Sequence, residues 1–201
     1  MVFRPRIFLI QKRYVMLHQT KPNERIYRKT KMLDIDLTPD KKLRVTVSHD
    51  DPRHYMSLLV VFAMPRLVIE TVECAMIRFP HKECRLAESS LKEMVGMEIG
   101  PGIVKLARKK NSGKGCTHLN NLFHEACYSV IQGHGICRRD QIEKLLPGLN
   151  VEQTLKIIIM LRPQLRNSCV VFNANSNLMH AVGKARLPLE GDEMADLLAK
   201  L

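Results

Sequence analysis

The pattern of apolar and polar residues predicts strands in the first part of the chain. Apolar and polar residues partly alternate over 25–37 and again over 43–47, as in strands with one buried face. The segment 48–52 has the composition of a loop. The segment 55–64 is almost continuously apolar, which is typical of a central strand, and 67–76 follows a short turn. These four segments predict an antiparallel meander of three to four strands.

From Arg85 onward the apolar period changes from 2 to 3.6, which predicts helices. One helix follows Cys84, a second begins at Pro101, and a third begins at Cys116 after a glycine turn. Gly133 is expected to end the third helix. Its predicted apolar stripe consists of Leu119, Leu122, Phe123, Ala126, Val130 and Ile131.

The last third of the chain has a different pattern of apolar and polar residues. We expect a short helix capped by Asp140, a very apolar helix over 151–161 and a short amphipathic helix from Asp192. The segments 169–172 and 178–182 flank a polar run and are interpreted as a hairpin.

Together these patterns predict the α+β class, with an antiparallel meander, helices packed on one of its faces, and a small C-terminal appendage of helices and a hairpin. We expect three parts: a basic N-terminal lead-in over 1–24, an α+β core domain over 25–133, and C-terminal helices and a hairpin over 134–201 packed on the core. The lead-in has three further interpretations: a transit peptide, a basic arm or an extra edge strand.

The composition shows that the chain is strongly basic. The chain has 201 residues, is 45% hydrophobic and carries a net charge of +12, so it is globular and strongly basic. A basic surface can serve solubility alone or an anionic partner, and both interpretations stay open. Aromatic residues are only 5% of the chain and Trp is absent, which weakens the case for stacking on single-stranded nucleic acid.

Four cations surround the glycine-rich loop before Cys116. They are Arg108, Lys109, Lys110 and Lys114. Because a helix N-terminus and nearby lysines together favour phosphate, they are candidates for binding a nucleic acid or a phosphorylated ligand. The alternative is a solvated charge run.

The cysteines and the hydropathy pattern indicate a compartment. Six cysteines occur without a convincing secretory signal, so reduced thiols in a cytoplasmic protein are expected. No run approaches the roughly 18 apolar residues of a membrane span, so no membrane is expected as a partner. A protein partner remains open, and the sequence does not indicate the oligomeric state.

Three soft ligands stand where predicted elements begin. Cys84 and Cys116 each precede a helix, and His54 precedes the central strand. A thiol at a helix N-terminus is favoured as the thiolate, the form that binds metal. The set His54, Cys84 and Cys116 can hold zinc, with a fourth position open to water, Asp or Cys169, or it can seat an iron–sulfur cluster. The alternative is two inert thiols at capped helix starts.

A thiol enzyme is the third hypothesis. Cys116 would be its nucleophile and His118 a candidate base. Residues two apart on a helix do not face each other, so His118 is expected to point away from Cys116. Cys74 and Cys127 are expected to be small core residues.

Several motifs resemble those of an uncharacterised bacterial family, one of the domains of unknown function. The motifs are Ile99-Gly100-Pro101-Gly102, the signature Gly115-Cys116-Thr117-His118-Leu119, an upstream element ending in Cys84, and a late Cys169. The resemblance covers roughly 25–182. Members often show His-Asp-Met-Trp at the central strand, where this chain has His54-Tyr55-Met56-Ser57. The resemblance implies no reaction.

The order of elements is also similar to that of U-type iron–sulfur scaffold proteins. On that pattern His54, Cys84 and Cys116 would occupy the three ligand places. Two departures stand out, since the first ligand is His rather than Cys and Glu83 replaces the glycine before Cys84. Histidine in place of a thiolate shifts the expected preference toward zinc.

Overall fold

The fold begins with a four-stranded antiparallel sheet. The structure is a computed structural model that describes residues 25–200, so the predicted lead-in lies outside the described residues. The strands are β1 (Thr30–Leu37), β2 (Leu43–Asp50), β3 (Tyr55–Ala63) and β4 (Val68–Arg78). Their spatial order follows the chain, β1-β2-β3-β4, with every neighbouring pair antiparallel. The predicted meander is confirmed.

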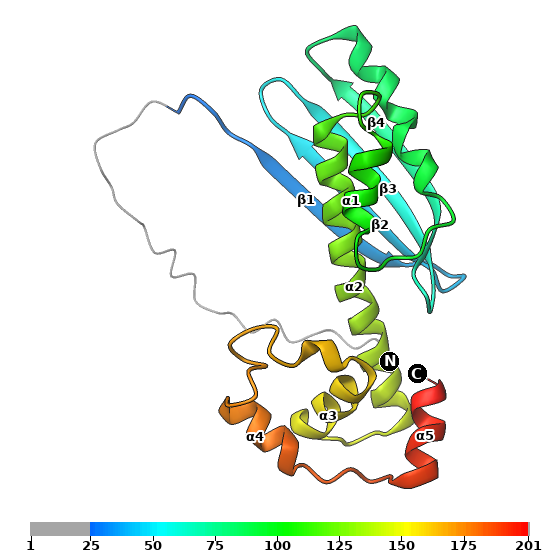
Figure 1. The fold of residues 1–201 in the computed structure, drawn as a ribbon, viewed down its shortest axis with the longest axis vertical. Coiled ribbons are helices and arrows are strands. Elements are labelled where there is room, and N and C mark those ends of the chain that lie inside the picture. The colour runs from blue at the N-terminus through cyan, green and yellow to red at the C-terminus, as the bar shows by residue number, and fades with distance from the viewer. Residues whose placement is uncertain (1–24, 201) are drawn as a thin grey trace.

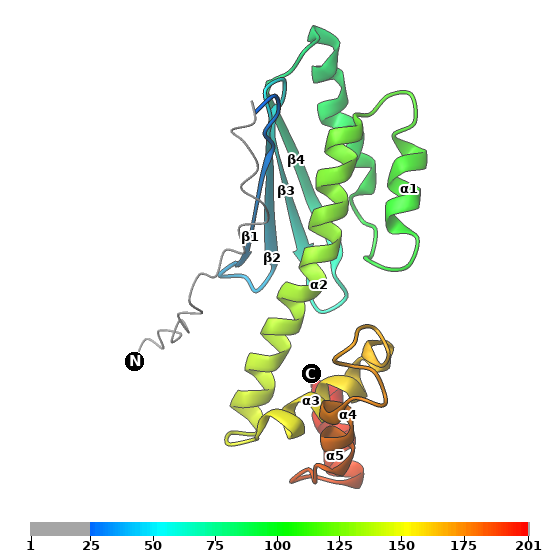
Figure 2. The same cartoon turned by 90° about the vertical axis from the view of Figure 1, so that its left-hand side faces the viewer.

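Helices follow the sheet along the chain. They are the 3₁₀ helices η1 (Lys82–Met94) and η2 (Pro163–Leu165) and the α-helices α1 (Ile103–Lys110), α2 (Thr117–Leu145), α3 (Val151–Leu161), α4 (Asn177–Lys184) and α5 (Gly191–Lys200). Figures 1 and 2 show η1, α1 and the first half of α2 on one face of the sheet, while α2 continues beyond it to α3, α4 and α5. The α+β class with helices on one face is confirmed.

The main core lies between the sheet and α2. The alternation in β2 and β3 directs one set of side chains toward the helices, as expected from period 2. The predicted stripe of α2 meets them, except that Ile131 is 42% exposed. Residues of this core with no more than 1% exposure include Leu43, Val45, Val47, Leu58, Val60, Phe62, Leu119, Leu122, Phe123 and Ala126.

The prediction that Gly133 ends a helix was wrong. The helix α2 runs through Gly133 to Leu145, and Asp140, the expected cap of the next helix, lies inside it. A Cβ atom at position 133 would lie 2.8 Å from Cγ2 of Ile35 in β1. The glycine therefore permits a close crossing of helix and strand rather than a stop. The helix α2 also crosses the boundary expected after residue 133, and the division into domains stays a prediction.

The prediction of a C-terminal hairpin was also wrong. Residues 168–172 form turns, and 177–184 form α4, whose first turn is capped by the Ser176 side chain accepting from the N–H of Met179. The predicted helices are present as α3, which starts with a capping box at Asn150 and Gln153, and as α5. Two small apolar clusters hold this half together. None of the helices in residues 25–200 is both long and apolar enough to cross a lipid bilayer.

Candidate metal site

The alternation of β2 carries a histidine onto the helix-facing side of the sheet. Leu43, Val45 and Val47 are buried on this side, and His49 occupies the next position of the same series, with 3% exposure. The expected loop over 48–52 is wrong for its first three residues. Those residues stay in β2 because they pair with β1 on one side and β3 on the other.

The turn after β2 brings an aspartate and a second histidine to the same end. The N–H of Asp51 donates to the carbonyl of His54 at 2.8 Å. In return, Oδ1 of Asp51 accepts from the N–H groups of Arg53 and His54, both at 2.8 Å. This side-chain–backbone turn fixes Asp51, which is 6% exposed, and places His54 just before β3.

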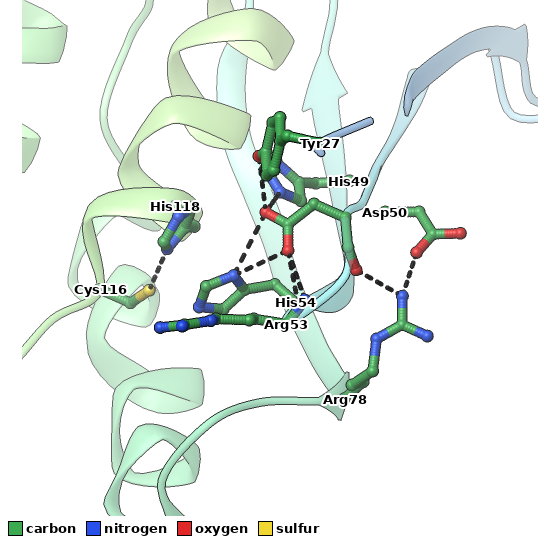
Figure 3. Close-up of polar contacts among 9 residues, drawn as sticks. Tyr27, His49, Asp50, Arg53, His54, Arg78, Cys116 and His118 are labelled. Atoms are coloured by element: carbon green, nitrogen blue, oxygen red, sulfur yellow. Dashed lines mark hydrogen bonds and ion pairs between the residues drawn. The ribbon is translucent and has the colours of Figure 1, made fainter. Parts of the chain in front are cut away.

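Helix α2 supplies the third imidazole. His118 is its second residue, and its ring centroid lies 4.1 Å from that of His54 and 5.3 Å from that of His49. Figure 3 shows His118 and Cys116 facing His54 across the gap between the helix and the sheet. Packing of α2 on β2 and β3 therefore completes a group that no single segment could form.

Four side chains of this group can hold a metal ion. One ligand atom each of His49, Asp51, His54 and His118 lies within 4.8 Å of the others. Within residues 25–199, no other set of three or more His, Cys, Asp or Glu side chains is as close. Three of the four, His49, Asp51 and His54, lie close together in the sequence, and His118 comes from α2, so the convergence of all four is a property of the fold.

Hydrogen bonds keep the aspartate ionised. Burial raises the pKa of Asp51, but hydrogen bonds from His49 and from the Arg53 and His54 N–H groups outweigh it and hold the pKa well below its usual range. The Asp51 carboxylate lies 2.7 Å from Nε2 of His49 and 3.1 Å from Nδ1 of His54. These contacts fix the orientation of the two imidazoles beside the carboxylate.

The imidazole of His118 is kept neutral. Burial, together with the neighbouring His54 and His49, lowers the pKa of His118. Neutral imidazole is the form that donates a lone pair to a metal ion.

Two further side chains hold the aspartate turn. The Tyr27 hydroxyl donates to Asp51 at 3.1 Å, and partial burial and this contact raise the pKa of Tyr27. Arg78 of β4 donates to the Asp51 carbonyl at 2.6 Å and also pairs with Asp50. The turn is therefore fixed from both edges of the site (Figure 3).

The three predicted ligands have different places. His54 belongs to the group of four. Cys116 is the N-cap residue of α2, and its Sγ lies 3.8 Å from Nδ1 of His118, so the expectation that the two side chains point apart was wrong. Cys84 lies in η1, half-buried against the main core, and neither cysteine is a member of the group of four. A shared site of His54, Cys84 and Cys116 stays a prediction.

The predicted anion-binding cations are partly engaged elsewhere. Lys110 and Lys114 both pair with Glu93 of η1, the former at 3.9 Å. Arg108 and Lys109 have no carboxylate partner within residues 25–199. A role for this cluster stays a prediction.

His49, Asp51 and His118 were missed as candidate ligands. His49 and Asp51 were placed in a loop, and His118 was expected to face away. The signal that could have found His49 and Asp51 is their place at positions 49 and 51 of the series that begins with Leu43, Val45 and Val47.

Comparison with known families places this chain. The model of the family described as "Protein of unknown function (DUF2889)" matches residues 12–132, and the chain belongs to this family. The match includes all four residues of the candidate metal site. Neither a curated protein nor a solved structure matches the chain.

Proposed function

We propose that this protein binds a divalent transition metal, zinc in the first place, through His49, Asp51, His54 and His118. The observation that carries the proposal is the convergence of these four ligand atoms within 4.8 Å of one another. Two of the four residues are buried, and the other two are half-buried at the edge of the group, so an ion has a path of entry.

The donor set favours zinc over an iron–sulfur cluster. Three imidazoles and one carboxylate are typical of zinc and related transition metals, whereas clusters are held mainly by thiolates. The iron–sulfur alternative, with Cys84 and Cys116, rests on the resemblance in layout to U-type scaffold proteins. That resemblance supports an accessory role in which the protein holds an ion.

Binding requires only a modest contraction of the group. Ligands about 2.1 Å from a tetrahedral zinc ion lie about 3.4 Å apart, somewhat closer than the present upper limit. Each ligand enters without its proton, and the ionised Asp51 and neutral His118 already meet this condition.

Zinc content tests the proposal. The full chain is purified without affinity tag or chelator, and bound metal is measured by mass spectrometry before and after reconstitution with zinc. We expect about one equivalent of zinc per chain. Less than about a tenth of an equivalent, unchanged by reconstitution, would refute metal binding.

Matched variants locate the site. His118→Ala should weaken zinc binding by more than about ten-fold, because it removes a ligand. His124→Ala is the control, since His124 is an exposed residue of the same helix outside the group. Cys84→Ser and Cys116→Ser should retain zinc. Loss of zinc in both cysteine variants, with retention in His118→Ala, would instead favour the set His54, Cys84 and Cys116.

The contact between Cys116 and His118 supports a second candidate function, thiol chemistry. A thiol 3.8 Å from an imidazole nitrogen at a helix N-terminus has the arrangement of an activated nucleophile. The rate of cysteine alkylation, described in the Discussion, tests this candidate.

A further inference from the structure

The cysteine at the start of α2 does not cap the helix with its side chain. Cys116 is the N-cap residue, a position where Ser, Thr, Asp or Asn commonly accepts a hydrogen bond from an N–H group of the first turn. The Cys116 side chain makes no such hydrogen bond. Its sulfur lies instead 3.8 Å from Nδ1 of His118. The thiol therefore contacts a candidate metal ligand rather than the end of the helix.

Cys116 itself lies outside the group of four. Its sulfur is not among the ligand atoms that lie within 4.8 Å of one another. Figure 3 shows Cys116 on the side of the His118 ring that is turned away from His49. The sulfur therefore contacts the His118 ring from outside the group.

The other two histidines of the group face the carboxylate. Nε2 of His49 lies 2.7 Å from Asp51, and Nδ1 of His54 lies 3.1 Å from it. Within residues 25–199, the hydrogen-bond partner of the His118 ring is Cys116. Each imidazole of the group therefore has a partner that fixes its orientation, and for His118 this partner is a thiol.

The contact with sulfur distinguishes the two ring nitrogens of His118. A neutral imidazole has a proton on one nitrogen and a lone pair on the other, and a thiol sulfur is a weak hydrogen-bond acceptor. When Nδ1–H donates to the sulfur, the lone pair is on Nε2. A histidine that binds a metal commonly donates its other ring N–H to a neighbouring acceptor, which fixes the tautomer and the ring orientation.

We propose that Cys116 is a positioning residue of the metal site. Its sulfur accepts a hydrogen bond from Nδ1–H of His118 and so directs Nε2 of His118 to the ion. The inference rests on the proposed function, because it assigns a role within the same site. It also gives a reason for a cysteine at the N-cap position, where serine is a better cap.

The ring nitrogens of His118 report this arrangement directly. The full chain is reconstituted with zinc, and its histidine rings are followed in long-range ¹H–¹⁵N NMR spectra, which distinguish protonated, lone-pair and zinc-bound nitrogens. The signals of His118 are identified by their absence from His118→Ala. We expect zinc on Nε2 and a proton on Nδ1.

Variants at position 116 test the role of the sulfur. Cys116→Ala removes the acceptor and should weaken zinc binding by about three- to ten-fold, less than the loss of a ligand does, because sulfur is a weak acceptor. Part of its zinc-bound His118 should also bind through Nδ1. Cys116→Ser keeps an acceptor and should restore both properties. Cys137→Ala, which alters a half-buried thiol of the same helix outside the group, is the control and should match the unaltered chain.

Two results would overturn this role of Cys116 while zinc binding itself stands. They are zinc on Nδ1 of His118 in the unaltered chain, and a Cys116→Ala variant with the zinc affinity and the His118 spectrum of the unaltered chain. Absence of zinc from the unaltered chain would overturn the proposed function and this role with it. Should Cys116→Ala fail to fold, the spectrum of the unaltered chain decides.

Discussion

Polar groups near the two ends of α2 have different hydrogen-bond partners. At the N-terminal end, three histidines and an arginine surround Asp51, a carboxylate whose oxygens accept hydrogen bonds from backbone and side chains alike. At the C-terminal end, Arg138 and Arg162 face the buried His134 without a carboxylate partner in the described chain.

This difference shows that one buried carboxylate determines which further charge its surroundings favour. With Asp51 present, the buried imidazoles have an anionic acceptor, and the group is ready for a cation that displaces protons. Around His134 the described chain has no paired acid, and the half-buried guanidinium groups of Arg138 and Arg162 disfavour further positive charge. The same helix therefore has an ionised carboxylate beside its N-terminal end and a cluster of guanidinium groups beside its second half.

The largest effect is expected from removing the carboxylate of Asp51. In metal-free protein, Asp51→Ala should lower the free energy of unfolding by about 3–5 kcal/mol, because several buried donors lose their acceptor. Asp50→Ala is the control, since the Asp50 side chain is exposed and pairs with Arg78, and it should cost at most about 1 kcal/mol. Urea unfolding measures both. Equal losses would show that Asp51 does not hold the N-terminal end together.

Lowering the pH should destabilise the other end of α2 through the protonation of His134. Burial and the flanking Arg138 and Arg162 lower the pKa of His134 from 6.5 to about 4. Between pH 6.5 and pH 4, His134 is protonated in the unfolded chain but neutral in the folded chain. Stability from this residue is therefore complete above pH 6.5 and is lost as pH falls toward 4, by at most about 3 kcal/mol.

The measurement is urea unfolding at pH 7 and pH 4 for the unaltered chain and for His134→Gln. Glutamine can still accept from an arginine but does not titrate. The unaltered chain should lose more stability between these pH values than His134→Gln does. The same loss in both proteins would contradict a depressed pKa for His134.

Between its two ends, α2 packs closely against β1, and substitutions of two glycines test this packing. Gly133→Ala should destabilise the protein by about 1–3 kcal/mol, because the new Cβ would lie 2.8 Å from Cγ2 of Ile35. Gly135→Ala is the matched control two residues along the helix, where the new Cβ would meet Nη1 of Arg162 at 3.9 Å, an ordinary van der Waals contact. It should stabilise by up to about 1 kcal/mol through helix propensity. Thermal unfolding distinguishes the two signs, and equal effects would contradict a tight crossing.

Periodicity predicted the meander and the start of each long helix because both are local properties of the chain. It did not predict the length of α2, since the reason for Gly133 is a contact with Ile35, which lies 98 positions away. Likewise, His54 could be named from its place before a buried strand, whereas its partner His118 depends on how α2 packs on the sheet. Long-range packing, which a single sequence does not display, decided both.

Alkylation of the cysteines gives the mildest test of the N-terminal end. Burial raises the pKa of Cys74 and Cys127 to about 12, so about one thiol in 10⁵ is ionised at pH 7 and both should react last with iodoacetamide. Cys116 should react faster than Cys137, whose pKa is raised by burial and by Asp140. Peptide mapping by mass spectrometry follows each site.

Zinc then separates metal binding from thiol chemistry at that end. If His118 is a ligand, zinc draws its imidazole into the group of four and away from service as a base for Cys116, 3.8 Å away. Zinc should therefore slow alkylation of Cys116 while leaving the exposed Cys169, in the other half of the molecule, unchanged. A Cys116 rate no faster than that of Cys137 would count against the thiol candidate. A Cys116 rate that zinc does not alter, in protein shown to bind zinc, would place the ion away from His118.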